Sequence, residues 1–272
     1  MADPNTSVTV DLNGKYFSWR GDIIGSGEMR ILSETKNKAV FYALNFLTPW
    51  KSIAEVDFTL KEKGGKTLVI WTLESGLPWY LFWMKKTMET YIKLDYNRGL
   101  HLLKDFVEKK NTCCGLKIEG VKKFEGFIYI GHKRSCKMSE FEDKMKDDFQ
   151  NIFPKWGELY GKDLKGNPFT LYHKFDAVKN KVIYEIGIPL KKKIEGVESP
   201  YFVKILPKME VYSILHKGAY RHLKNAWAVQ MMHQRAKKFK KNKNFPPFEI
   251  YLNSPENTKE NALETAVYYP IR

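Results

Sequence analysis

The residues with the clearest chemical potential lie in one short stretch near the end of the chain, residues 246–252. Side chains alternate between the two faces of a strand, so Glu249 and Tyr251 are predicted to project together from one face. The other face is apolar and holds Phe248, Ile250 and Leu252. A carboxylate beside a phenol can bind a cation or transfer a proton. The same pair can also lie on a solvated outer surface, where charged residues usually are.

An internal repeat surrounds this strand. Residues 127–189 have the pattern of strand, helix, strand and strand, and residues 211–271 repeat it. In both copies Pro-Phe-x-aliphatic-Tyr begins the third element, at 168–172 and at 247–251, and a proline closes the fourth. We therefore expect an α+β domain made of two βαββ units about a pseudo-twofold axis. Its helices should lie on one side, with a central cleft between the two sheets.

The two copies differ at the carboxylate. When they are aligned on the Pro-Phe dipeptide, Tyr251 corresponds to Tyr172, whereas Glu249 corresponds to Thr170. A residue that only the fold requires should tend to occur in both copies. The unshared Glu249 is therefore the better functional candidate.

The motifs of the second copy carry a family resemblance. Residues 210–220 contain Glu-Val-Tyr and His-Lys-Gly-Ala-Tyr, and they are followed by Trp227, by Pro-Phe-Glu-Ile-Tyr at 247–251 and by Val-Tyr-Tyr-Pro-Ile at 267–271. With these motifs the chain from about residue 122 to its end resembles the gyrase-inhibitor-like domain, the effector-binding module of bacterial multidrug-responsive transcription activators. The resemblance implies that Glu249 is buried among aromatic walls and binds lipophilic cations. Some relatives hydrolyse cyclopropane-containing toxins in the same pocket, and the resemblance does not distinguish the two activities.

The predicted ligand-binding residues combine this carboxylate with aromatic side chains. Tyr220 precedes the predicted helix of the second copy, and Trp227 lies on that helix, either in the core or as a wall of the cleft. Trp156 ends the apolar stripe of the first copy's helix; such a stripe is usually core, but its far end could reach the cleft. The predicted set is Glu249, Tyr251, Tyr268, Trp227, Tyr220, Trp156 and Tyr172.

Two functions follow from a glutamate in such surroundings. Burial raises the pKa of the carboxyl group and makes an unpaired anion costly. A lipophilic cation restores the lost solvation, and ring faces add a cation–π attraction of about 0.5–2 kcal/mol, which predicts a sensor or sequestering protein. The same raised pKa suits a general acid or base, with Tyr251 or Tyr268 as proton partner, which predicts a hydrolase of strained electrophiles. Both hypotheses need one carboxylate among aromatic rings. We expect ligand binding by this domain, with hydrolysis as the alternative.

The first part of the chain predicts a different domain. Strand-like runs lie between residues 16 and 73, Gly64-Gly65 indicates a hairpin, and helical spacing follows up to Glu108. The motifs at 16–19, 25–31 and 71–73 resemble strands of the START/polyketide-cyclase-like (SRPBCC) helix-grip fold. That fold implies an antiparallel sheet closed by a C-terminal helix, and a third hypothesis, a carrier of lipid or polyketide. Its usual first strand and short helices have little room before residue 16, which indicates an N-terminally truncated form.

We therefore divide the chain into residues 1–110, a linker at 111–123 and residues 124–272. No apolar run reaches the length of a membrane span, and Met1-Ala2-Asp3-Pro4 lacks the pattern of a secretory signal. The three cysteines, Cys113, Cys114 and Cys136, predict neither a disulfide framework nor a zinc site. Dinucleotide, Walker-type and nucleophile-elbow motifs are absent from the sequence. We expect a cytoplasmic protein without metal or cofactor.

The chain is strongly basic, with a formal net charge of +15 and a sequence pI near 9.4. Basic residues concentrate at 191–193 and at 235–243. The second cluster lies at a predicted helix C-terminus, where the helix dipole favours cations by about 0.3–1 kcal/mol each, so helix stabilisation and solubility explain it without a partner. Nucleic-acid binding is the alternative, and the absence of a helix-turn-helix, zinc-finger or RNP-type pattern argues against it. The predicted partner is a hydrophobic or cationic small molecule; the oligomeric state does not follow from the sequence.

Overall fold

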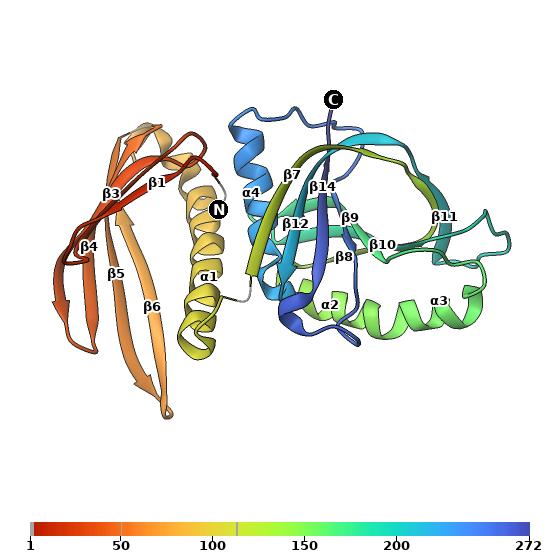
Figure 1. The fold of residues 1–272 in the computed structure, drawn as a ribbon, viewed down its shortest axis with the longest axis horizontal. Coiled ribbons are helices and arrows are strands. Elements are labelled where there is room, and N and C mark those ends of the chain that lie inside the picture. Colours follow the sequence, from red (N-terminus) through yellow and green to blue (C-terminus); the bar gives the residue numbers. More distant parts are fainter. Residues whose placement is uncertain (1–2, 50, 113) are drawn as a thin grey trace. The chain divides into compact units, whose positions relative to one another are not determined.

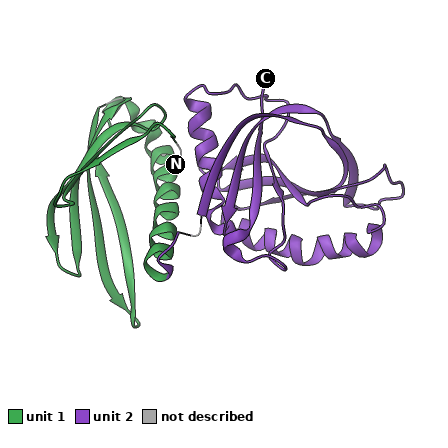
Figure 2. Ribbon diagram, in the orientation of Figure 1, with its two compact units in different colours: residues 1–108 green, residues 109–272 purple. Residues whose placement is uncertain are grey.

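The computed structural model describes residues 3–49, 51–112 and 114–272 (Figure 1). Met1 and Ala2, on which the expected lack of a secretory signal partly rests, lie outside the described residues, as does Cys113 of the predicted linker. The chain divides into two compact units, Met1–Glu108 and Lys109–Arg272 (Figure 2). The described residues form one antiparallel sheet in each unit.

Unit 1 is an antiparallel meander followed by one long helix, and the strand order in its sheet is the order in the sequence. Its strands are β1 (Ser7–Val10), β2 (Tyr16–Gly21), β3 (Gly25–Thr35), β4 (Ala39–Thr48), β5 (Ser52–Lys63) and β6 (Lys66–Ser75). The 3-10 helix η1 (Trp79–Met84) leads into α1 (Lys85–Lys109). Gly64 and Gly65 connect β5 to β6 with φ angles of 59° and 70°, so the predicted hairpin uses the left-handed conformations that glycine permits.

Helix α1 packs on an aromatic cluster of this sheet. The ring of Trp71 stacks on Tyr96 of α1 with 3.9 Å between centroids, and on Phe58 with 4.8 Å. Gly99 permits this approach, because a Cβ atom there would lie 2.5 Å from the Trp71 ring. A sheet followed by a helix that packs on it is the arrangement that the helix-grip resemblance predicts. The assignment to the START-like family itself stays a prediction.

Unit 2 contains both predicted βαββ repeats, and the α+β fold class is confirmed. The first repeat has β8 (Phe127–Cys136), η2 (Met138–Glu140), α2 (Phe141–Asp147), the π-helical turn η3 (Asp148–Ile152), α3 (Phe153–Tyr160), β9 (Phe169–Asp176) and β10 (Lys181–Pro189). The second has β12 (Met209–Gly218), η4 (Tyr220–His222), α4 (Lys224–Arg235), β13 (Phe248–Tyr251), η5 (Glu260–Ala262) and β14 (Glu264–Pro270). Matched bridges support the pseudo-twofold relation: Leu164 pairs with Leu190 in the first repeat, and Lys241 pairs with Ile271 in the second.

The two repeats share one eight-stranded sheet, which corrects the predicted pair of sheets with a cleft between them. The strand order is β11-β8-β10-β9-β13-β14-β12-β7, and the pairing of β9 with β13 joins the repeats. Joining satisfies two strand edges that separate sheets would leave unpaired. Strand β7 (Cys114–Phe124) lies beside β12, and β11 (Tyr201–Leu206) lies beside β8. Most of the predicted linker 111–123 is therefore the strand β7.

The sheet of unit 2 has an apolar cluster on each face. One cluster contains Trp156 of α3 together with Tyr184 and Ile186 of β10, and we call this side the helical face. The other contains Phe169 of β9 and Phe248 of β13, and we call it the opposite face. Because successive side chains alternate, the neighbours of Phe248 along β13 must lie on the helical face.

Candidate functional site

Strand β13 places Glu249 and Tyr251 on the helical face of the sheet. Glu249 pairs with Thr170 of β9 on one side and with Val267 of β14 on the other, so it lies in the middle of the sheet where the repeats join. Its residue surface is 2% exposed. This burial excludes the solvated outer surface that the sequence alone left open.

Three neutral donors hold the Glu249 carboxylate. The hydroxyl of Tyr172 donates to Oε1 at 2.6 Å, and that of Tyr251 donates to the same oxygen at 2.5 Å. The indole Nε1 of Trp227 donates to Oε2 at 3.0 Å. Among the described residues, Glu249 has no ion pair with a lysine, an arginine or a histidine. The site is therefore a buried carboxyl group without a cationic partner in the protein.

The electrostatics of the site follow from this isolation. Burial raises the pKa of Glu249, and the hydrogen bonds from Tyr172, Tyr251 and Trp227 offset only part of that effect. Burial, followed by the proximity of Glu249, raises the pKa values of Tyr172 and Tyr251 well above 10. The phenols therefore stay protonated and act as donors. A cation brought by a ligand would favour the ionised carboxylate.

Aromatic rings enclose the carboxylate. The rings of Tyr172 and Trp227 meet edge to face with 5.1 Å between centroids, and Tyr220 meets Tyr251 at 5.7 Å. Burial and the proximity of Glu249 raise the pKa of Tyr220 to about 12. These four rings give walls suited to an aromatic or cationic ligand.

The structure therefore brings together five of the seven predicted site residues: Glu249, Tyr251, Tyr172, Trp227 and Tyr220. Tyr268 does not belong to this group. It pairs with Phe248 across the strands and packs on Phe248 and Phe124, so it lies on the opposite face. This corrects its assignment to the site, because residues that pair directly across neighbouring strands lie on the same face of the sheet, and Phe248 faces away from Glu249.

Trp156 is not beside the carboxylate either. It is fully buried in the helical-face cluster of the first repeat, where its ring meets Phe153 and Tyr201 at 5.6 and 5.3 Å. The core interpretation of the apolar stripe thus applies to Trp156, and its predicted place as a ligand-binding residue stays a prediction.

Sequence reasoning missed three residues around the site. Thr170 Oγ1 lies 3.0 Å from the hydroxyl of Tyr251, and since that hydroxyl donates to Glu249, Thr170 is the donor to it. The ring of Phe149 meets Tyr251 at 5.0 Å, and Phe141 meets Tyr172 at 6.0 Å. The alignment of the two repeats, in which Thr170 corresponds to Glu249, is a signal from which Thr170 could have been found. The two phenylalanines belong to a stripe that the sequence alone cannot divide into core and site.

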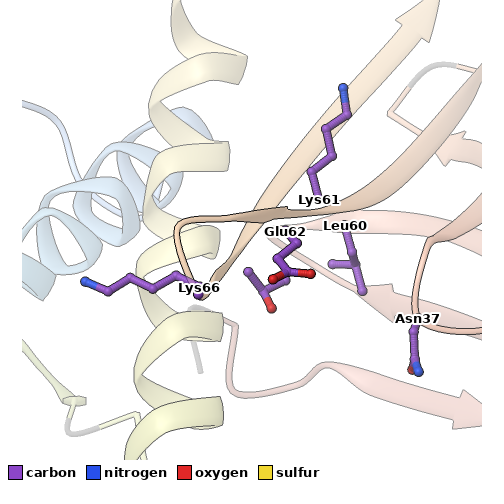
Figure 3. A pocket seen from close by; sticks show the side chains of 7 residues that line it. Asn37, Leu60, Lys61, Glu62 and Lys66 are labelled. Atoms are coloured by element: carbon purple, nitrogen blue, oxygen red, sulfur yellow. The ribbon is translucent and has the colours of Figure 1, made fainter.

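Two open hollows lie elsewhere, in unit 1. One, of about 300 Å³, is formed beside the β5–β6 hairpin and is lined by polar side chains such as Lys61, Glu62 and Lys66 (Figure 3). Another, of about 230 Å³, contains Glu28, Arg30 and other residues of β2–β4. Both are shallow and polar, so neither resembles a pocket for an apolar ligand. The Glu249 site, by contrast, is closed in this structure.

Other kinds of site find no support among the described residues. No three His, Cys, Asp or Glu side chains lie together in an arrangement that would hold a metal ion. Cys114 and Cys136 have free thiols, and burial raises the pKa of both. No helix in the described part of the chain combines the length and apolar character that crossing a membrane requires.

Comparison with known proteins gives one family match. A model of the GyrI-like small-molecule-binding domain matches residues 121–272. Among curated proteins, none matches the sequence significantly. Solved structures with a similar fold include EcmrR in complex with DNA, at 16% identity and a TM-score of 0.48, covering 72% of each chain. A putative transcription regulation protein from Staphylococcus aureus shares 15% identity, with a TM-score of 0.42 over 58% of this chain and 99% of that one. SAV2435 bound to tetraphenylphosphonium shares 14%, with a TM-score of 0.43 over 56% of this chain and 92% of that one.

Proposed function

The chain belongs to the GyrI-like small-molecule-binding domain family through residues 121–272, and we propose that its Glu249 site binds a lipophilic cation. The observation that carries the proposal is a 2% exposed carboxyl group held by three neutral donors and paired with no cation among the described residues. A buried anion without a partner is costly, and a ligand that supplies one positive charge removes that cost.

The aromatic walls of the site favour particular groups around the positive charge of the ligand. The rings of Tyr172, Tyr251, Trp227 and Tyr220 offer faces and edges to an aromatic or alkyl cation. A strongly hydrated ion such as K⁺ gains little from such walls, whereas a bulky organic cation loses little hydration on entry. Because the site is closed, a ligand of this size must displace the covering rings as it binds.

The binding test compares two buried carboxylates in the full chain. Tetraphenylphosphonium, a permanently charged aromatic cation, is titrated by calorimetry, with triphenylphosphine oxide as the neutral analogue. We expect saturable binding of the cation alone, and at least a tenfold loss, about 1.4 kcal/mol, in the Glu249→Gln variant. Glu185→Gln is the matched control, because Glu185 is 1% exposed and lies on the opposite face. Equal binding of cation and neutral analogue, or equal loss in both variants, would reject the proposal.

A second candidate function is hydrolysis of a strained electrophile. Its support is the 2.5 Å hydrogen bond from Tyr251 to Glu249 together with the raised pKa of that carboxyl group, since a protonated Glu249 can deliver a proton and an ionised one can activate water. Turnover of cyclopropane or epoxide substrates by the wild type, abolished in Glu249→Gln, would favour it. Binding of such substrates without formation of product would reject hydrolysis and leave ligand binding as the function of the site.

A further inference from the structure

The excess of positive charge lies almost entirely in unit 2. Residues 109–272 contain 32 Lys and Arg against 18 Asp and Glu, a formal charge of +14, while the whole chain carries +15. Solubility alone gives no reason for such a division between two units of one chain. A reason for the excess positive charge must therefore be sought on the surface of unit 2.

Within unit 2 the positive charge is concentrated in one loop. No Asp or Glu occurs from Val211 to Phe248. The end of α4 and the loop that follows it, residues 235–243, contain six cations in nine positions; we call this segment the basic loop. Its cations are Arg235, Lys237, Lys238, Lys240, Lys241 and Lys243, and all but the half-buried Lys241 are exposed.

The cations of the basic loop are unpaired. No carboxylate among the described residues lies within 4.0 Å of any of them, nor of the neighbouring Arg272. Some cations elsewhere in unit 2 do have partners, for example Arg134 with Asp148 and Lys204 with Glu185. The exposed Glu210 lies near the C-terminal residues, since its carbonyl oxygen accepts a hydrogen bond from the amide of Ile271, but its side chain forms no ion pair with these cations.

The basic loop packs against the rest of unit 2. Phe239, in its middle, is 8% exposed and stacks on Tyr212 of β12 with 4.4 Å between ring centroids. The amide of Arg272 donates to the carbonyl of Lys240 at 2.9 Å, so the loop runs beside the C-terminal residues (Figure 1). Lys237 adopts a φ of 57°, a conformation that costs a non-glycine residue about 1 kcal/mol. The chain thus presents a crowded positive surface in one ordered arrangement.

The helix dipole explains only part of this surface. It favours cations in the last turn of a helix, which covers Arg235 and the residues just beyond it. Lys240, Lys241 and Lys243 lie beyond that range, where like charges repel one another without compensation. An anionic partner removes this repulsion.

The chemistry of the loop points to phosphates in a duplex. Exposed aromatic or large apolar side chains beside the lysines would favour insertion into a membrane surface, and a single strand would call for rings on which bases stack. The one aromatic residue inside the loop, Phe239, is turned into the core. We propose that the basic loop and Arg272 bind the phosphate backbone of double-stranded nucleic acid without reading its sequence. The absence of a base-reading motif agrees with such contacts, because phosphate contacts need none.

Binding of a labelled 20-base-pair DNA duplex to the full chain, followed by fluorescence anisotropy over a salt series, tests this proposal. Each phosphate contact contributes about −0.9 to the slope of log K against log salt, so seven contacts, from the six loop cations and Arg272, predict a slope of about −6. In the triple variant Lys240→Gln, Lys241→Gln, Lys243→Gln the slope should fall to about half, and affinity should drop at least tenfold. Affinity should be the same for unrelated duplex sequences.

The matched control removes the same charge from the segment that follows the first repeat, with Lys191→Gln, Lys192→Gln and Lys193→Gln. This control should bind the duplex as the wild type does, and thermal unfolding of both variants checks that they fold. Equal loss in the control, or no salt-dependent binding by the wild type, would overturn the proposal. Binding to vesicles that contain anionic phospholipid but not to the duplex would also overturn it, in favour of a membrane surface.

Discussion

Tyr172 and Tyr251 donate hydrogen bonds to the same oxygen, Oε1 of Glu249, from equivalent positions of the two repeats. The pairing of β9 with β13 brings both tyrosines to the pseudo-twofold axis. The residue equivalent to Glu249 in the first repeat is Thr170, and it supports Tyr251 instead of adding a second charge. Two tyrosine hydroxyls at equivalent positions of the repeats thus donate to one carboxyl group that occurs in the second repeat alone.

Removing either tyrosine hydroxyl should weaken cation binding. In Tyr172→Phe the carboxylate loses one donor, so its pKa rises further and the ionised form that a cation needs becomes less favourable. We expect the affinity for tetraphenylphosphonium to fall about tenfold at pH 7 and to recover as the pH is raised. Calorimetric titrations at several pH values measure this. Tyr268→Phe is the control, because that hydroxyl lies on the opposite face; an equal loss there would show that the effect is not local.

The two buried glutamates should respond to neutralisation with opposite signs. Burial favours the protonated form of both, but at Glu185 the nearby His173 and Tyr129 and the ammonium group of Lys204 outweigh it and lower the pKa. Glu185→Gln should therefore cost about 1.5–3 kcal/mol of folding free energy, as weakening hydrogen bonds to a buried charged group does; the half-exposed Lys204 adds little because water screens it. Glu249→Gln should leave stability unchanged or raise it. Urea unfolding at pH 7 compares them, and a large destabilisation by Glu249→Gln would mean that this carboxylate is structural.

The pH dependence of stability should report Glu249 directly. Its pKa is raised in the folded state above the unfolded value of 4.5, so the folded protein holds this proton more tightly. The contribution of this proton to folding stability is present at low pH and is lost as the pH rises from about 4.5 through the raised folded pKa. The difference in thermal stability between the wild type and Glu249→Gln, measured at several pH values, isolates the contribution of Glu249. A difference that grows in favour of the wild type with rising pH would contradict the raised pKa.

His216 should give the opposite slope. It is fully buried, and burial, followed by the nearby His222, lowers its pKa from 6.5 to about 4. The contribution of a base with a depressed pKa is present above 6.5 and is lost as the pH falls toward 4, up to about 3 kcal/mol. A His216→Asn variant should therefore lose less stability than the wild type between pH 6.5 and 4 in urea unfolding. An unchanged slope would show that His216 becomes protonated without cost in the folded state.

The sequence predicts the components of the site better than their arrangement. Alternation and the repeat single out Glu249, Tyr251 and Tyr172, because period-2 patterns and matched prolines are local signals. The failure at Tyr268 is one of register, since the face on which a residue of β14 lies depends on its pairing with β13, and one residue of slip exchanges the faces.

Long-range pairing also explains the errors in topology. Residues 111–123 carry no strong strand pattern, yet most of them form β7, because β12 supplies a partner about a hundred residues later in the chain. The single sheet likewise depends on β9 meeting β13. Neither contact leaves a local signature in the sequence.

Thr170 offers a test of how the site sets the charge of its ligand. It is fully buried directly across from Glu249, so Thr170→Asp would place a second carboxyl group beside the first. Two adjacent carboxyl groups cannot both ionise cheaply, and one keeps its proton until two positive charges arrive. The variant should therefore prefer a bis-quaternary aromatic dication over tetraphenylphosphonium by at least tenfold more than the wild type does. Thr170→Asn, of similar size and without charge, should keep the wild-type preference. If Asp and Asn variants show the same ratio of affinities, the charge of the site does not select the ligand, and the shape of the aromatic walls must do so.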